Sequence, residues 1–392
     1  MRVRFAFLSC LILTACSSAI RPLAVPGESY DAVRPIVPAR AAYKSIFSFG
    51  GTAGAVPYAG LVGVKGTLYG TTSTGGTGPG VVFKITPQGA EQAIYSFTGG
   101  NDGGVPIASL KYSNGFLYGT TTVGGGSANC GTVFRMTLGG AIKTLHSFKN
   151  NADGCTPEAP LLDVKGTFYG TTHDGGKQNG VGDGTVFKIT TSGSEKVLYA
   201  FKGSRYNDAG TPVAGVTNLN GVLYGTTDGG GPKQDGTVYK VTLSGAEKVL
   251  HIFTGKDGNS PLSRLCLVNG IFYGTTSSGG AKNLGTVFAV GKAGVLKVLH
   301  SFRGADGAMP PLGGLVYYKG AIYGVTSAGG AKNAGTIFRM TLAGKETVLY
   351  SFGGGYDGVS PSGTLASVNG VLFGTTSGGG TNGKGTVYAM RP

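Results

Sequence analysis

The chain has 392 residues, of which 75 are glycine and 40% are apolar, and its formal charge is +15. A glycine share almost three times the usual value of about 7% would indicate disorder in an aperiodic chain, but these glycines recur at fixed offsets and are typical of turns. No stretch carries an apolar stripe at helical spacing, which excludes a helical protein, and the excess of Lys and Arg favours anionic partners.

The first residues have the pattern of an export signal. Arg2 and Arg4 precede an apolar run, residues 5–13, that is too short to cross a bilayer. The tetrad that ends at Cys16, Leu-Thr-Ala-Cys, resembles the lipobox of bacterial lipoproteins, in which the cysteine is lipidated and becomes the mature N-terminus. We expect a lipoprotein signal peptide at 1–15 and lipid attachment at Cys16, with ordinary secretion as the alternative.

Residues 16–40 are Pro-rich and unpatterned, and we interpret them as a flexible tether. Ser17 follows the cysteine at the place where an aspartate favours retention in the inner membrane. The lipobox resemblance therefore implies an exported, membrane-anchored protein at the outer membrane or cell surface.

From residue 41 onward, four motifs recur about every fifty residues, seven times each. A Tyr-Gly-Thr-Thr motif begins at Tyr69, Tyr118, Tyr169, Tyr224, Tyr273, Tyr323 and Phe373. A proline opens the next run at Pro57, Pro106, Pro157, Pro212, Pro261, Pro311 and Pro361. A Ser-Phe-like pair and a Gly-Thr-Val-aromatic run keep the same period, which is close to that of a propeller blade.

Each repeat reads as four short strands. In the third repeat the expected strands are 160–164, 167–172, 184–190 and 196–201, where β-branched and aromatic residues alternate between Gly, Asn and Pro. Asn-Gly or Lys-Gly separates the first two strands of every repeat, as in a tight type I′ hairpin. We predict an all-β, seven-bladed β-propeller with four antiparallel strands per blade, covering 41–392.

The phase of the repeats predicts how the ring closes. Residues 44–49 are a fourth strand without the first three, and residues 385–390 are a third strand without a fourth. The N-terminal strand should therefore complete the last blade, which removes two open sheet edges. A linear β-solenoid needs no such matching ends and is the alternative. A closed ring of this kind is expected to be a monomer.

Two cysteines of the repeat region fall in loops on the same face of the predicted ring. Cys130 precedes a third strand, and Cys155 follows the next fourth strand. In an exported protein they are expected to form a disulfide, or else remain two free thiols. Cys266, between Leu265 and Leu267, reads as a small buried residue.

A row of lysines recurs in the loops between second and third strands of five consecutive repeats: Lys177, Lys233, Lys282, Lys332 and Lys384. Repeat symmetry places them on one face, where they would form an arc around the central channel. Such an arc could attract lipopolysaccharide, acidic polysaccharide or DNA. The alternative is that exposed loops carry lysine for solubility.

A row of aspartates occupies the loops before the first strands: Asp102, Asp153, Asp208, Asp257, Asp306 and Asp357. Each loop offers one carboxylate, whereas calcium takes six to eight oxygens. We therefore expect these aspartates to bond their own backbone, and we assign no metal and no cofactor.

Three of the four histidines, His146, His251 and His300, fill a place held elsewhere by Phe47, Tyr95, Tyr199 and Tyr350. This exchange with Phe and Tyr predicts a packing role. His173 and Asp174 break the pattern and are the candidate pair for catalysis, although no nucleophile elbow or phosphate loop accompanies them.

The repeat unit, Phe-Thr-Gly-Gly-Asn-Asp-Gly followed by Leu-Tyr-Gly-Thr-Thr and Gly-Thr-Val-Phe, resembles the Gloeo–Verruco repeat family. The resemblance covers nearly all of 44–390 and implies an exported bacterial protein with a propeller-like fold and a surface anchor. It implies no reaction and no catalytic residue.

We interpret the chain as a lipid-anchored surface module that binds or interacts through its propeller, with an anionic polysaccharide, lipopolysaccharide or a protein as partner. The alternative is an exported propeller enzyme, a polysaccharide lyase or hydrolase, with its site in the central channel. An enzyme should show non-equivalent polar residues at one end of the channel, because fold alone does not separate the two.

Overall fold

The computed structural model describes residues 42–177, 182–203 and 208–392. By its internal contacts the chain divides into 1–40 and 41–392, and only the second unit is described. The predicted signal peptide, the predicted lipid attachment at Cys16 and the predicted tether lie outside the described residues. No helix in the described part of the chain is long and apolar enough to span a membrane.

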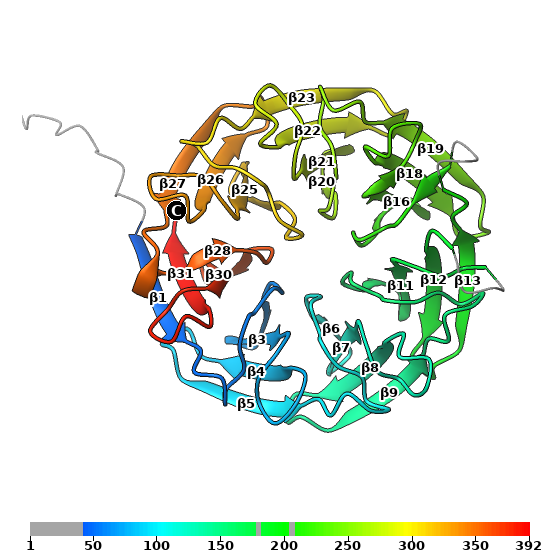
Figure 1. The fold of residues 1–392 in the computed structure, drawn as a ribbon, viewed down its shortest axis with the longest axis horizontal. Helices are drawn as coiled ribbons and strands as arrows, with labels where there is room; N and C mark the ends of the chain where they lie inside the picture. The colour runs from blue at the N-terminus through cyan, green and yellow to red at the C-terminus, as the bar shows by residue number, and fades with distance from the viewer. Residues whose placement is uncertain (1–41, 178–181, 204–207) are drawn as a thin grey trace, which may run out of the picture. The chain divides into compact units, whose positions relative to one another are not determined.

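The described unit is a ring of seven four-stranded antiparallel sheets, as predicted (Figure 1). The strands nearest the channel are β2 (Val62–Val64), β6 (Lys111–Ser113), β10 (Leu162–Val164), β15 (Thr217–Leu219), β20 (Cys266–Val268), β24 (Val316–Tyr318) and β29 (Ala366–Val368). The second strands are β3 (Thr67–Thr72), β7 (Phe116–Thr121), β11 (Thr167–Thr172), β16 (Val222–Thr227), β21 (Ile271–Thr276), β25 (Ala321–Thr326) and β30 (Val371–Gly378).

The third strands are β4 (Val81–Ile85), β8 (Thr132–Thr137), β12 (Thr185–Thr190), β18 (Thr237–Thr242), β22 (Thr286–Gly291), β26 (Thr336–Thr341) and β31 (Thr386–Arg391). The outermost strands are β5 (Glu91–Ser96), β9 (Ile142–Ser147), β13 (Glu195–Ala200), β19 (Glu247–Ile252), β23 (Leu296–Ser301), β27 (Glu346–Ser351) and β1 (Ala42–Ser48). The loops add β14 (Ala209–Gly210), β17 (Gly229–Gly230), β28 (Val359–Pro361) and a 3-10 turn, η2 (Gly355–Asp357). We number the blades from the one that begins with β2; the seventh contains β29, β30, β31 and β1.

The glycine of the Tyr-Gly-Thr-Thr motif lets two strands pack face to face. A Cβ on Gly119 would lie 2.5 Å from the ring of Phe134 on β8 and 2.9 Å from Leu110. The third-strand aromatic therefore crosses the second strand where only glycine leaves room. Equivalent contacts recur in the other blades.

The second threonine of the motif bonds the third strand. Thr121 Oγ1 lies 2.9 Å from Thr132 Oγ1, and both side chains are buried. Five further blades have the same pair, whereas Val81 replaces the partner of Thr72 in the first blade. A buried hydroxyl needs a partner, which explains why the two threonines recur together.

The core lies between neighbouring blades. One cluster joins Val64 and Tyr69 of the first blade to Leu117 and Phe134 of the second, and similar clusters follow around the ring. Each blade therefore buries one face against the next.

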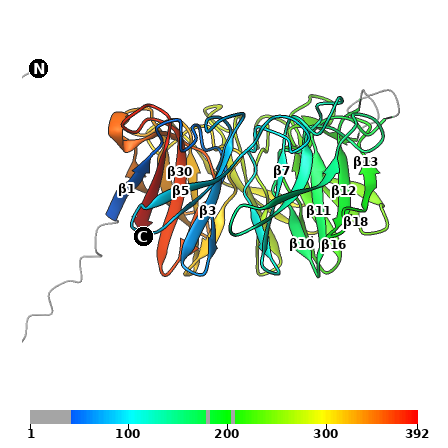
Figure 2. The same cartoon turned by 90° about the horizontal axis from the view of Figure 1, so that it is seen from below.

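The strands end on two different faces, which Figure 2 shows edge-on. Tight hairpins close one face. Their first residue has positive φ throughout, at Lys65, Asn114, Lys165, Asn220, Asn269, Lys319 and Asn369, as a type I′ turn requires. The longer loops gather on the other face, which we call the long-loop face.

The ring closes as predicted. β1 pairs antiparallel with β31, from Ala42 opposite Arg391 to Ser48 opposite Thr386. Tyr43 adds a side-chain link, because its ring stacks on Tyr350 of the sixth blade with centroids 3.9 Å apart.

Candidate functional site

Each loop enters the channel through a residue in the left-handed region, although none of these residues is glycine. They are Val56, Val105, Thr156, Thr211, Ser260, Met309 and Ser360, with φ between 52° and 58°. Val105 N–H, for example, donates to Pro79 O of the blade that the loop has just left. Left-handed backbone is unfavourable for β-branched residues, so backbone hydrogen bonds between the loops of neighbouring blades hold the channel entrance in shape.

The central channel contains a cavity of about 460 Å³, lined by all seven blades. Most of its wall is apolar or backbone. Five side chains in it have ionisable groups and differ from the residue that most repeats place there: Tyr58, Lys111, Glu158, Arg264 and Cys266.

Arg264 projects from the segment that leads into β20. The equivalent places hold Gly60, Ser109, Pro160, Gly215, Gly314 and Thr364. Its Nε donates to Thr217 Oγ1 at 3.2 Å, and no carboxylate of the described residues lies within ion-pair distance of it. Burial lowers the pKa of Arg264, and Cys266 raises it in part. A cation in this position, without an anion beside it, suits an anionic group of a ligand.

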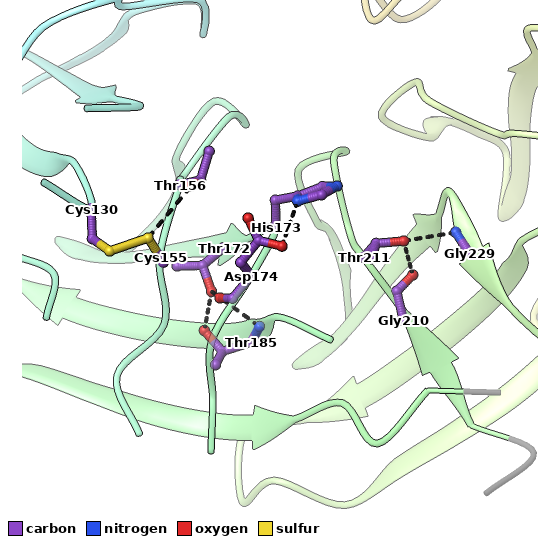
Figure 3. A network of polar contacts seen from close by, with 10 residues as sticks. All are labelled: Cys130, Cys155, Thr156, Thr172, His173, Asp174, Thr185, Gly210, Thr211 and Gly229. Carbon is purple, nitrogen blue, oxygen red and sulfur yellow. Dashed lines mark hydrogen bonds and ion pairs between the residues drawn. A yellow bond between two sulfur atoms is a disulfide. The ribbon is translucent and has the colours of Figure 1, made fainter. Parts of the chain in front are cut away.

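Glu158 lies on the same wall, where other blades place Tyr58, Ile107 and Val213. Burial raises the pKa of its carboxyl group; His173 lowers it, and the charges of Asp174 and Asp228 raise it. The charges of His173 and Asp174, the candidate pair from the sequence, therefore act on Glu158. In Figure 3, His173 and Asp174 lie side by side on the loop after β11, with His173 Nδ1 3.0 Å from Asp174 Oδ1.

Sequence reasoning missed Asp228, which is the repeat equivalent of His173. The other blades carry a hydroxyl here, at Ser73, Thr122, Ser277, Ser327 and Ser377. Ser73 Oγ donates to Val56 O, and Thr122 Oγ1 to Val105 O, so the usual role is to hold the channel entrance. In the third and fourth blades an ionisable group replaces that hydroxyl, and Asp228 Oδ1 is buried without a hydrogen-bond partner among the described residues. Aligning the seven loops against one another would have revealed this departure.

Cys130 and Cys155, offered by the sequence as a disulfide or two free thiols, are bonded, with an S–S distance of 2.11 Å. Figure 3 shows the bond beside Thr156, where the loop enters the third blade. Cys266 is a free, half-buried thiol.

The five lysines Lys177, Lys233, Lys282, Lys332 and Lys384 are all exposed on the long-loop face. Their loops fold toward the outer strands: Ala281 N–H donates to Ser301 Oγ of β23, and Ala331 N–H to Ser351 Oγ of β27. The lysines therefore lie over the outer part of the blades, and none lines the cavity. Lys177 Nζ is 3.6 Å from Asp183 Oδ2, and this carboxylate partly offsets the positive charge that Lys177 presents to a ligand.

The aspartates of the loops hold the loops themselves. Asp257 accepts hydrogen bonds from Thr254 N–H at 2.8 Å, from Thr254 Oγ1 at 3.0 Å and from His251 Nε2 at 2.8 Å. Burial alone would raise the pKa of Asp257, but these hydrogen bonds bring it below its ordinary value. Asp102, Asp208 and Asp357 accept from Tyr95, Tyr199 and Tyr350 in the same way.

The prediction of a pure packing role for His146, His251 and His300 is therefore wrong in part. Their rings do pack edge-on against Phe148, Phe253 and Phe302. Each Nε2 also lies within 3.2 Å of an aspartate oxygen, as the Tyr hydroxyl does in other blades. Phe47 occupies the place in the one blade whose loop lacks the aspartate, with Ala53 instead.

One solved structure with a TM-score above 0.5 supports the fold. A candidate 6-phosphogluconolactonase from Bacteroides uniformis is similar with a TM-score of 0.52 and 13% identity, over 80% of this chain and 88% of that one. A gluconolactonase from Xanthomonas campestris has a TM-score of 0.40 and 12% identity, over 67% and 82%. At such identities the likeness extends to the fold alone. No curated protein matches the sequence.

The model of the Gloeobacter/Verrucomicrobia repeat matches residues 30–209 and 181–388. These two overlapping matches span the whole ring and include the segments that line the channel. The chain belongs to the Gloeobacter/Verrucomicrobia repeat family.

Proposed function

We propose that the chain is an exported, membrane-anchored propeller that binds an anionic polysaccharide on its long-loop face, with one acidic group of the polymer held in the channel by Arg264. The observation that carries the proposal is the place of Arg264, a cation in the channel wall with Thr217 as its hydrogen-bond partner.

The lysines support a second, weaker contact with the same polymer. Lys233, Lys282 and Lys332 are exposed, and no carboxylate of the described residues lies within ion-pair distance of them. They follow one another on three consecutive blades, so a chain lying along the outer part of the face would meet them in turn. Each exposed charge contributes little alone, but together they make binding depend on salt.

The test measures binding of polygalacturonate by titration calorimetry at two salt concentrations, with neutral pullulan as the reference polymer. Arg264→Ser, which copies Ser109 of the second blade, should weaken binding about tenfold or more at both salt concentrations, because it removes one of the two cations that line the channel and leaves only Lys111. Replacing all five lysines by Gln should remove most of the salt dependence and leave the fold intact.

A parent protein that binds polygalacturonate no better than pullulan would overturn the proposal. So would an Arg264→Ser protein with unchanged affinity. Equal binding of double-stranded DNA would show that charge alone is recognised rather than a carboxylated sugar.

The anchor belongs to the same proposal. Cys16 at the end of the lipobox-like tetrad supports lipid attachment there. Cys16→Ser should shift the protein from the membrane fraction to the soluble fraction and abolish labelling with a fatty-acid analogue. Labelling that persists in this variant would contradict the assignment.

A second candidate function is favoured by the cluster at the channel mouth. Glu158, His173 and Asp228 each replace the residue type that most repeats carry at their place, and His173 and Asp228 both shift the pKa of Glu158. A polysaccharide lyase needs a cation that neutralises the uronate carboxylate and a base that removes the adjacent proton. Arg264 would supply the cation and His173 the base. Release of unsaturated products from polygalacturonate, read by ultraviolet absorbance and lost in His173→Ser, would establish this activity; absence of release leaves the binding function.

A further inference from the structure

The outer rim of the ring repeats one arrangement at each meeting of two blades. We call this the outer junction: the Tyr, His or Phe near the end of one outermost strand, the aspartate of the loop that follows, and the first residue of the next outermost strand. In six junctions that first residue is Glu91, Ile142, Glu195, Glu247, Leu296 or Glu346; in the seventh the equivalent place is held by Tyr43, the second residue of β1.

The sixth blade meets the fifth at a junction with three metal-binding groups. His300 Nε2 lies 2.9 Å from Asp306 Oδ2, and one ligand atom from each of His300, Asp306 and Glu346 lies within 4.8 Å of the other two. Two ligand atoms of a tetrahedral zinc ion, each about 2.1 Å from it, are about 3.4 Å apart. His300 Nε2 and Asp306 Oδ2 are closer than this because they share a hydrogen bond, so an ion would replace that bond and move the two side chains slightly apart.

Two of these side chains are held in place by other contacts. Asp306 Oδ1 accepts Arg303 N–H at 2.8 Å, which orients the carboxylate and leaves Oδ2 toward His300. The ring of His300 packs edge-on against Phe302, with centroids 5.0 Å apart. Such outer contacts reduce the entropy that a ligand set loses when it binds a metal.

The third side chain lacks a partner. Glu346 Oε1 is buried and accepts no hydrogen bond from the described residues. A second carboxylate, that of Asp306, lies beside it. The same oxygen is buried without a partner among the described residues in Glu91, Glu195 and Glu247. Two neighbouring carboxylates are costly when both are ionised, and either a proton on one of them or a cation between them removes that cost.

We propose that His300, Asp306 and Glu346 bind a divalent transition-metal ion of the zinc class, which links the fifth blade to the sixth. One imidazole and two carboxylates are a ligand set of this class rather than of calcium, which takes oxygen ligands only. Water completes the coordination. The site is independent of the channel and of the polymer.

Neighbouring junctions supply comparisons within the same chain. The fifth junction has His251, on β19 of the fourth blade, and Asp257, but the next outermost strand begins with Leu296. The fourth junction has Glu247 near Asp208, but Tyr199 in place of histidine. The third junction has the same three residue types, His146, Asp153 and Glu195, with His146 and Asp153 3.2 Å apart; it is expected to bind the same ion more weakly.

The test is titration of the untagged full chain with Zn²⁺ after chelator treatment, followed by Co²⁺ substitution and its visible absorption spectrum. We expect one site with a Kd below about 1 µM and a Tm that rises with added Zn²⁺. His300→Tyr copies Tyr199 and can still bond Asp306, so the fold should persist while affinity falls at least about a hundredfold. Glu346→Leu copies Leu296 and should weaken binding at least about tenfold.

Glu247→Leu is the matched control, because it removes an equivalent glutamate from a junction without histidine. Zinc affinity should not change in this variant. The proposal is overturned if the parent chain shows no site tighter than about 100 µM, if His300→Tyr binds zinc as tightly as the parent, or if Glu247→Leu weakens binding as much as Glu346→Leu.

Discussion

At the scale of single residues, each loop aspartate depends on the aromatic residue that faces it. The chain places Tyr or His opposite every loop that has the aspartate, and Phe47 opposite the loop that has Ala53. A hydroxyl or imidazole can donate to a carboxylate, and a phenyl ring cannot. The aspartate and the aromatic residue that faces it are therefore expected to contribute to the free energy of unfolding together rather than independently.

Asp257→Ala should lower the free energy of unfolding by about 1–3 kcal/mol, because Thr254 N–H and His251 lose their acceptor. Adding His251→Phe recreates the Phe47 and Ala53 pair and should cost little more. Urea unfolding of both single variants and the double variant forms the cycle. Strictly additive losses would show that the two residues act independently.

A second effect at this scale is set by pH. Burial raises the pKa of Glu91 to about 7, and its Oε1 has no hydrogen-bond partner in the described residues. Since the folded-state pKa lies above the unfolded value, the protonated group stabilises the fold below about pH 4.5, and this contribution is lost as pH rises through 7.

Glu91→Gln should therefore raise the melting temperature relative to the parent at pH 8.5 and leave it nearly unchanged at pH 4. The gain corresponds to about 1 kcal/mol at most, because the group is only half-buried and solvent screens its charge. Ile142→Val in the next blade is a control without a charge. An equal gain at both pH values would contradict the assignment to ionisation.

At the scale of loops, one contact is made by different chemistry in different blades. The disulfide between Cys130 and Cys155 joins the loop before β8, in the second blade, to the loop that enters the third blade. At the equivalent positions two blades further on, Asn259 Nδ2 donates to Asp235 Oδ1 at 2.6 Å. The contact thus belongs to the propeller architecture, and the disulfide is one way to strengthen it.

Replacing Cys130 and Cys155 by Ser should lower the free energy of unfolding by about 3 kcal/mol, the loop-closure value for a separation of 25 residues. Cys130→Asp with Cys155→Asn should recover about 1 kcal/mol of this loss. Denaturant unfolding under oxidising conditions measures both. A double Ser variant as stable as the parent would show that the disulfide does not constrain the unfolded chain.

The strands and turns could be predicted from the sequence because each strand and turn motif occurs seven times. Even the strained turn positions at Lys65, Lys165 and Lys319 follow from their alignment with Asn-Gly turns. The third repeat differs from the prediction mainly at its first strand, where β10 keeps only Leu162–Val164 of the expected 160–164. The residues before it leave the sheet to line the channel.

The channel residues were not accessible in this way. Glu158 and Arg264 stand at positions where the repeats vary freely, and only the closed ring brings them into one cavity. The sequence did single out His173 and Asp174, because this pair stands alone in its loop and breaks the repeat pattern. It did not reveal the hydrogen bonds of His251 and His300, because exchange with Tyr looks like packing until the aspartates are compared blade by blade.

At the scale of the whole molecule, the ring depends on one strand that is far from its partner in sequence. β1 supplies the outermost strand of the seventh blade, and Phe49 N–H continues the pairing to Gly385 O at 3.0 Å. Tyr43 then connects that blade to the sixth through Tyr350. Without β1, β31 would be an exposed edge.

Deleting 42–48 should lower the melting temperature by roughly 10 °C or more and increase aggregation, because it bares β31 and removes the stack on Tyr350. Deleting seven residues between 20 and 35 is the length-matched control. Differential scanning calorimetry with light scattering measures both effects. A truncated protein that melts at the parent temperature would rule out closure through β1.

The direction of β1 also determines how the ring bears a mechanical load. Ala42 lies at the tight-hairpin face, and the strand runs from there to the long-loop face. If the chain is pulled at Ala42 while a ligand on the long-loop face resists, the force runs parallel to β1 and loads all its bonds to β31 at once. The closure is then loaded in shear geometry, in which all the hydrogen bonds between β1 and β31 resist the force together. This geometry resists force better than an unzipping geometry, in which the bonds break one at a time.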